Sequence, residues 1–97
     1  MTEFEERMAA LRQQFVVRCA DRIEVLQDAL SRDDRATIAS TAHALAGTAG
    51  IFSFSELSRS ARLLEEAAES PTSDCEALKA LAGDLVEQLK TIAGVKD

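Results

Sequence analysis

The pattern of apolar residues along the chain predicts four helices in succession. In each of four segments, apolar positions recur at steps of three and four, which is the period of one helical face. The segments run from Thr2 to Leu30, from about Arg35 to Ile51, from about Ser55 to Glu69, and from just after Ser73 to about Ala93. Alternating runs of Val, Ile and Thr, which would indicate strands, are absent from the sequence.

The first apolar stripe is the longest. It comprises Met8, Leu11, Phe15, Cys19, Ile23, Leu26 and Leu30. No glycine or proline interrupts this segment, so we expect one long helix rather than a short helix followed by a second one that begins near residues 13–15. The predicted inward side of the last helix is equally regular, with Leu78, Leu81, Leu85, Leu89 and Ile92.

The predicted helix boundaries carry capping signals. Three Ser or Thr residues are followed three positions later by Glu, which is the capping-box pattern: Thr2–Glu5, Ser53–Glu56 and Ser73–Glu76. Asp33 or Asp34 can cap the second helix, Pro71 stops the third, and Gly94 can cap the end of the fourth. Because the connections are short, consecutive helices should pack antiparallel. We therefore predict an all-α, up-down-up-down four-helix bundle.

Composition restricts the class of protein further. Ninety-seven residues, 46% of them apolar, suffice for a single domain over residues 1–97 with one modest core. The net charge of −6 argues against nucleic acid as a partner, since phosphate-backbone binding needs a basic face. Cys19 and Cys75 do not form a disulfide framework, Cys19 being expected in the core, and with a single histidine they make a zinc site improbable.

The sequence lacks an apolar stretch long enough to span a bilayer, and its start lacks a signal-peptide pattern. We therefore expect no membrane association and a cytoplasmic location. Met1 and the capped first helix predict a complete chain.

The segment Thr37–Phe54 holds the features that point to function. It contains the only histidine, His43, and two of the four glycines, Gly47 and Gly50. The apolar stripe of this segment consists of Ile38, Ala42, Leu45, Ala49 and Phe52. On a helix, His43 lies about 100° away from this stripe. Its own face carries only small residues, namely Ala36, Ala39, Ser40, Ala46, Gly47 and Gly50.

The two glycines need an explanation, because each destabilises a helix by roughly 1 kcal/mol relative to alanine. They fit close packing of helices through small residues. They also fit a helix that ends near Gly50. A third explanation is that a bulky partner must approach His43 and the neighbouring backbone. The spacing alone leaves these three open.

The residues Ala42-His43-Ala44-Leu45-Ala46-Gly47-Thr48-Ala49-Gly50, followed by Leu57 and by Leu63-Leu64-Glu65, resemble the signature of the histidine phosphotransfer (HPt) domain family. The resemblance implies that His43 is a phosphoacceptor, loaded by a receiver-domain aspartate and unloaded onto another receiver. It implies response-regulator receivers, and a hybrid sensor kinase, as partners. Such a chain is a phosphoryl carrier rather than a kinase, and it needs no cofactor because the receiver brings the Mg²⁺.

The chain departs from the family pattern at one position. Ala46 stands where the family usually has a lysine that helps to hold the phosphoryl group. The candidates for that supporting role are Arg62, Arg59, Glu65 and Thr48. Each also fits a plain surface role, as a solvated charge or, for Thr48, as a hydroxyl bonded to its own helix.

The predicted docking surface is small and apolar, and consists of Ala39, Ala46, Gly47 and Gly50. Phe54 either adds an exposed apolar contact to it or fills the end of the core.

Three other readings remain. The chain could be an adaptor that binds a receiver without carrying phosphate, which Ala46 favours. It could be the dimerisation and phosphoacceptor part of a sensor kinase, which needs two chains to complete four helices. Because this chain supplies four helices itself, we predict a monomer. It could also be a structural bundle with an incidental histidine, which leaves the glycine pair harder to explain.

Overall fold

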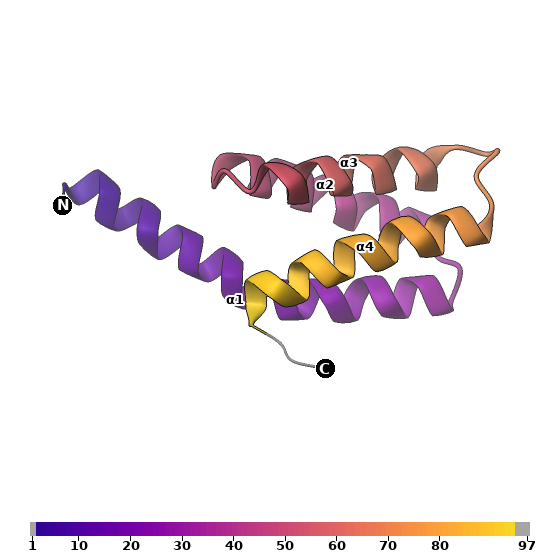
Figure 1. Ribbon diagram of the computed structural model, residues 1–97, viewed down its shortest axis with the longest axis horizontal. Coiled ribbons are helices and arrows are strands. Elements are labelled where there is room, and N and C mark those ends of the chain that lie inside the picture. Colours follow the sequence, from indigo (N-terminus) through magenta and orange to yellow (C-terminus); the bar gives the residue numbers. More distant parts are fainter. Residues whose placement is uncertain (1, 95–97) are drawn as a thin grey trace.

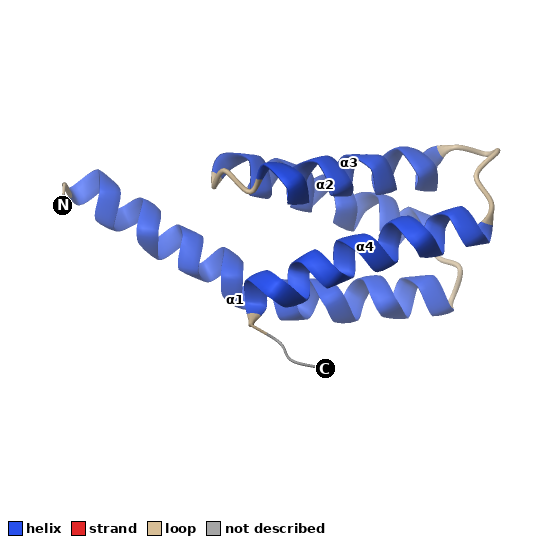
Figure 2. Cartoon of the chain, viewed as in Figure 1, coloured by secondary structure: helices blue, strands red, loops and turns tan. Residues whose placement is uncertain are grey.

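The computed structural model describes residues 2–94, which fold into four α-helices (Figures 1 and 2). These are α1 (Glu3–Ser31), α2 (Arg35–Ile51), α3 (Ser55–Glu69) and α4 (Cys75–Ala93). Consecutive helices run in opposite directions, and α1 and α3 each contact both α2 and α4. The prediction of an all-α four-helix bundle is confirmed. Met1, on which the expectation of a complete chain partly rests, lies outside the described residues.

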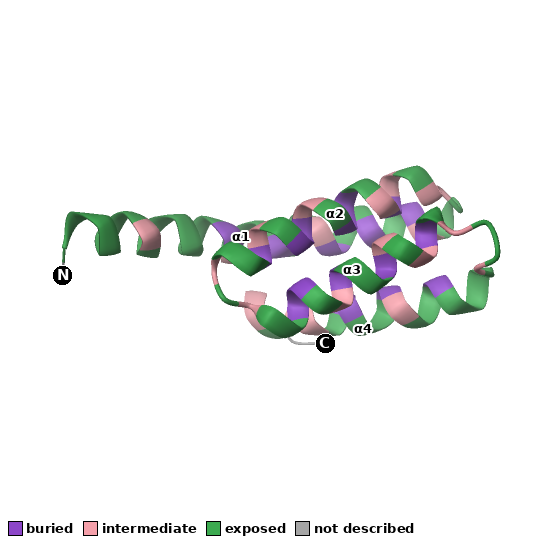
Figure 3. Cartoon of the chain, turned by 90° about the horizontal axis from the view of Figure 1, so that it is seen from above, coloured by how far each residue is buried: buried purple, intermediate pink, exposed green. Residues whose placement is uncertain are grey.

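The core consists of side chains from all four helices. Leu26, Leu45, Leu64 and Leu85 are each at most 2% exposed and represent α1, α2, α3 and α4 in turn. Burying one such leucine contributes about 1.5–3 kcal/mol. Cys19 is also fully buried, as predicted. Buried residues recur along all four helices (Figure 3), and their apolar contacts hold the bundle together.

Several helix ends are capped as predicted. The Thr2 hydroxyl accepts the Glu5 N–H at 3.1 Å, and the Asp34 carboxylate accepts the Thr37 N–H at 3.1 Å. Gly94 ends α4 in the left-handed conformation, with φ 74°. These contacts satisfy backbone groups that would otherwise have no partner within the helix.

The capping box predicted at Ser53 is wrong. Ser53 has φ 66° and follows the last turn of α2. Its N–H donates to the Gly50 carbonyl, and the N–H of Phe54 donates to the Ala49 carbonyl. This is the Schellman arrangement, which places Ser53 in the left-handed position where glycine is usual. Phe54 then becomes the residue before α3, and it makes no side-chain cap.

The box predicted at Ser73 is displaced by one residue. Asp74 caps α4 instead, and its carboxylate accepts the Ala77 N–H at 2.8 Å. Asp and Ser are about equally good in this position, so the sequence pattern alone does not choose between neighbours. The carbonyl of Ser73 accepts a hydrogen bond from Arg35, which ties the α3–α4 loop to the start of α2.

Helix α1 is continuous, as predicted, but it extends beyond the other three helices (Figures 1 and 3). The inward packing predicted for the start of its stripe is wrong: Leu11 is 43% exposed and Met8 is half-buried. Burial begins at Phe15, whose ring lies 5.8 Å from that of Phe52 and 5.4 Å from that of Phe54. Phe54 is thus half-buried and closes the end of the core, one of its two predicted placements.

Candidate functional site

His43 lies near the middle of α2, on the side of the bundle that α2 and α3 form. Its neighbours Ala42, Leu45 and Ala46 are buried in the core, and this fixes the rotation of the helix. The imidazole is turned out of the core, with 76% of the side chain exposed to solvent. The outward orientation predicted from the apolar stripe is therefore observed.

The Nδ1 atom of His43 lies 2.8 Å from the Oε2 atom of Glu65 on α3. The Glu65 side chain is only 22% exposed, so it is held more firmly than a freely solvated carboxylate. A carboxylate accepts hydrogen bonds, which requires Nδ1 to carry the proton. In the neutral ring, Nε2 then has the lone pair. Within residues 2–94, Nε2 makes no hydrogen bond, so the nitrogen that has the lone pair is without a protein partner on an exposed side chain.

A shallow hollow of about 320 Å³ lies beside the imidazole. It is lined by His43, Ala46, Gly47, Arg62, Glu65 and Glu66. Its formal charges are one guanidinium and two carboxylates, so the hollow by itself is not cationic. Glu66 is a lining residue that the sequence did not single out, since it resembles any other exposed charge on α3.

The two predicted arginines lie close together on α3. Arg62 also lines a neighbouring hollow, which it shares with Arg59 and Gly50. Within residues 2–94, neither guanidinium makes an ion pair or a hydrogen bond. Both positive charges therefore remain available to an anion that approaches His43, with Arg62 the nearer candidate.

The residues predicted for docking divide into two groups. Gly47 and Gly50 are exposed, and Ala39 is half-buried. Ala46 is only 5% exposed, and its carbonyl accepts a hydrogen bond of 2.8 Å from the buried hydroxyl of Ser58. Its side chain belongs to the α2–α3 contact. The expectation that Ala46 offers a docking contact is therefore corrected: Ala46 lies on the floor of the hollow.

The structure removes two of the three explanations for Gly47. A Cβ atom added at Gly47 meets no other atom within 4 Å, so close packing does not require glycine there. The helix continues to Ile51, more than one turn further on. The third explanation, that a bulky partner must approach His43, is the one that stays open for Gly47. Gly50 is different, because it lies in the last turn of α2 and an added Cβ atom would lie 3.7 Å from the Ser58 hydroxyl.

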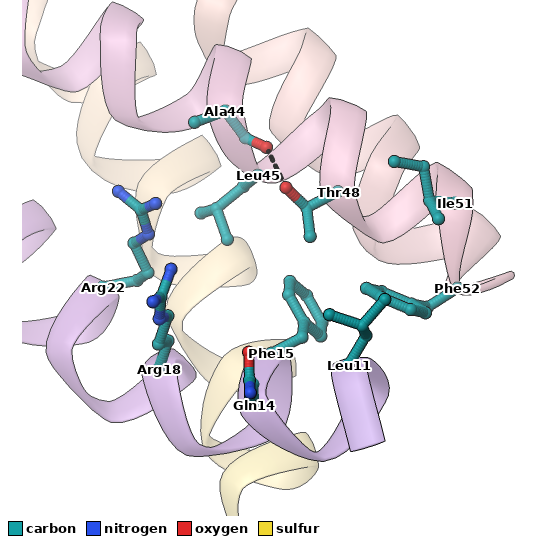
Figure 4. Close-up of a pocket in the computed structure, with 10 residues that line it drawn as sticks. All are labelled: Leu11, Gln14, Phe15, Arg18, Arg22, Ala44, Leu45, Thr48, Ile51 and Phe52. Carbon is teal, nitrogen blue, oxygen red and sulfur yellow. Dashed lines mark hydrogen bonds between the residues drawn. The ribbon is translucent and has the colours of Figure 1, made fainter. Parts of the chain in front are cut away.

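Thr48 does not belong to the site. Its hydroxyl donates to the Ala44 carbonyl at 2.9 Å, and it lines a groove toward α1 with Phe15 and Arg18 (Figure 4). Thr48 does not line the hollow beside His43, so the arrangement does not favour its predicted role in supporting a phosphoryl group. The alternative, a hydroxyl bonded to its own helix, is what the structure has.

The fold and site together define an antiparallel helical bundle that displays one histidine. The Hpt domain family model matches residues 10–93, nearly the whole chain, and the chain belongs to this family. Hpt domains carry out histidine phosphotransfer in phosphorelays and interact with receiver domains of two-component systems. Comparisons with curated proteins and with solved structures gave no match.

No helix in residues 2–94 is both long enough and apolar enough to cross a membrane. Within the same range, no group of three or more His, Cys, Asp or Glu side chains is placed to hold a metal ion.

Proposed function

We propose that His43 accepts a phosphoryl group from the phosphoaspartate of a receiver domain and passes it to the aspartate of another receiver. One observation carries the proposal. The exposed imidazole of His43 has Nδ1 bonded to Glu65 at 2.8 Å, which leaves Nε2 free to react.

In the loading step, the Nε2 lone pair attacks phosphorus in line with the aspartyl oxygen. The P–N bond forms as the P–O bond to the aspartate breaks, and the receiver regains its carboxylate. The ring takes on positive charge, because Nδ1 keeps its proton. Glu65 lies where that charge develops, and so it stabilises the product while fixing the reactive tautomer, the role that a carboxylate plays for histidine in hydrolase triads. The reverse attack by another aspartate unloads the ring.

Charge neutralisation is shared with the partner. Acyl phosphates are reactive, and phosphoryl transfer depends mainly on alignment and on neutralising the phosphoryl oxygens. Arg62, with Arg59 beside it, supplies the positive charge that Ala46 cannot. The carboxylates of Glu65 and Glu66 oppose it, so most of the neutralisation falls to the Mg²⁺ and lysine of the receiver.

Docking uses the low relief of α2 around His43. Gly47 and Gly50 leave the backbone beside the imidazole uncovered, with Ala39 at the other edge. A single chain is the unit of transfer, because all four helices that position His43 belong to it. A sensor-kinase dimerisation domain, which builds its bundle from two chains, fits this arrangement less well.

The test is transfer of label from a receiver domain phosphorylated with radiolabelled acetyl phosphate and Mg²⁺. The wild-type chain should gain acid-labile, alkali-stable label as the receiver loses it. His43→Gln should gain none while it keeps its helical circular dichroism. Label on the His43→Gln chain would refute the role of His43.

The composition of the hollow favours a second candidate function, a receiver-binding adaptor. The hollow carries Ala46 instead of a lysine and two carboxylates against one guanidinium. An adaptor would bind the receiver in a titration and would take up no label under the conditions that load a known carrier.

A further inference from the structure

The first three turns of α1 carry an apolar stripe that the bundle covers only in part. Phe4, Met8 and Leu11 follow one another at steps of four and three, and Phe15 continues the same face into the core. Phe4 is 70% exposed and Leu11 is 43% exposed. We call residues 3–14 the overhang; Figure 3 shows it as an almost entirely exposed helix beyond the bundle.

We propose that the overhang pairs antiparallel with the overhang of a second copy of this chain. Phe4 and Leu11 are seven residues apart, which is about 10 Å along a helix. Rotation by 180° about a point near Met8 places Phe4 of each copy beside Leu11 of the other, and the two Met8 side chains meet at the centre. The contact is self-complementary and closed, as a two-fold dimer requires.

The position of the bundle selects the antiparallel direction. The stripe of the overhang faces the same side of α1 as Phe15, and Met8 and Leu11 line hollows with Phe52. A helix that covers the stripe therefore lies on the side of α1 where its own bundle begins. A parallel partner would carry its own bundle into that of the first copy. An antiparallel partner brings only its N-terminal end to the tip of the bundle, and its own bundle lies beyond the far end of the pair.

The tip of the bundle has a place for the incoming phenylalanine. Ile51, which is 67% exposed, and Phe52 line two hollows there of about 300 Å³ and 290 Å³. Leu11 and Phe15 complete the apolar side of the larger one (Figure 4), and Met8 contributes to the smaller one. Phe4 of a second copy reaches this apolar surface once it lies beside Leu11.

The charges along α1 support the same direction. The first turn is acidic, with Glu3, Glu5 and Glu6. Arg7 follows it and pairs with Glu3 at 3.3 Å, and the next charged residues along the helix are Arg12 and Arg18. In the antiparallel pair, Glu5 of each copy lies close to Arg12 of the other. The two residues are offset by about two positions, or about 3 Å along the helix axis. A parallel pair would set like charges opposite one another, which is unfavourable.

The contact is small, so the dimer should be weak and should form by mass action. It leaves the site open, because His43 lies eight residues before the end of α2, about 12 Å from the tip of the bundle. The sequence analysis predicts a monomer because the chain supplies all four helices of its bundle. The proposed dimer departs from that prediction, and it does so through the overhang, which takes no part in completing the bundle. The inference therefore stands apart from the proposed phosphotransfer.

Sedimentation equilibrium over about a hundredfold range of concentration tests the pairing. The average mass of the wild-type chain should rise from one copy toward two. Phe4→Gln should weaken dimerisation at least about tenfold, because the residue lies at the apolar centre of each half of the contact. Val17→Gln is the matched control, since Val17 is 65% exposed on another face of α1 and should leave the mass unchanged.

A charge exchange tests the direction. Glu5→Arg and Arg12→Glu should each weaken the dimer, and the double variant should restore it. Arg12 also lies 4.8 Å from the centre of the Phe54 ring, so circular dichroism must show that the variants are folded. A chain that stays monomeric throughout would overturn the proposal. So would a Phe4→Gln variant that dimerises normally, or one that loses receiver binding instead.

Discussion

Replacing Gly47 with alanine should make the protein more stable and a poorer phosphotransfer partner. Alanine is favoured over glycine in a helix interior by roughly 1 kcal/mol. The added Cβ atom meets no atom of another helix within 4 Å, so packing between helices does not oppose this gain. For a domain of this size, 1 kcal/mol corresponds to an increase in Tm of about 4–8 °C.

The same methyl group should slow transfer. Gly47 lines the hollow beside His43. In the proposed transfer, a receiver brings its aspartate within bonding distance of Nε2 at this place. A displacement of about 1 Å from the reactive geometry can lower a rate about a hundredfold, so we expect kcat/KM to fall by at least about tenfold. The measurements are thermal unfolding by circular dichroism and the initial rate of label transfer from a phosphorylated receiver.

Gly83→Ala provides the matched control. Gly83 lies in α4, is exposed, and has no atom within 4 Å of an added Cβ atom. This variant should gain similar stability and transfer phosphate at the wild-type rate. If Gly47→Ala is stabilised and also transfers at the wild-type rate, glycine does not serve access there, and the reasoning about docking fails.

Three further predictions concern single side chains. Glu65→Ala should slow transfer by about tenfold or more. Glu65→Gln should slow it by less, because the neutral amide oxygen still accepts the hydrogen bond from Nδ1–H. Rates equal to that of the wild type would exclude the positioning role of Glu65. Hydrogen bonds from Thr37 lower the pKa of Asp34 in the folded state, so the free energy of unfolding should decrease as pH falls below about 4. Asp34→Asn keeps a cap acceptor but has no carboxylate to protonate, so its acid unfolding curve should show a weaker pH dependence. Burial raises the pKa of the Cys19 thiol, so a thiol reagent should modify the exposed Cys75 quickly and Cys19 only on unfolding. Rapid modification of both thiols in the folded protein would contradict the burial of Cys19.

The fold was predictable because its determinants are local and redundant. The bounds of α2 and α3 follow from apolar periodicity and from breakers on both sides. The cap residues were harder to predict, because the geometry of each turn rather than residue type places Phe54 before α3 and Asp74 before α4. The exposed overhang was missed because an apolar stripe specifies a face of a helix and does not specify whether another helix reaches it.

The site was predictable only in part, for a related reason. The exposure of His43 follows from its angle to the stripe of α2 alone. Its contact with Glu65 joins residues 22 positions apart, and therefore depends on the register between α2 and α3. That register also buries Ala46. Thr48 was misplaced because its angle to His43 carries it toward α1, which the resemblance to a family motif does not reveal.

The most direct test of the account is to identify which atom carries the phosphoryl group. The chain can be labelled with ¹⁵N in histidine, phosphorylated by a receiver, and studied by nuclear magnetic resonance through the coupling between nitrogen and phosphorus. The account predicts phosphorus on Nε2 of His43, with Nδ1 still protonated beside Glu65. Phosphorus on Nδ1, or on any other residue, would contradict it.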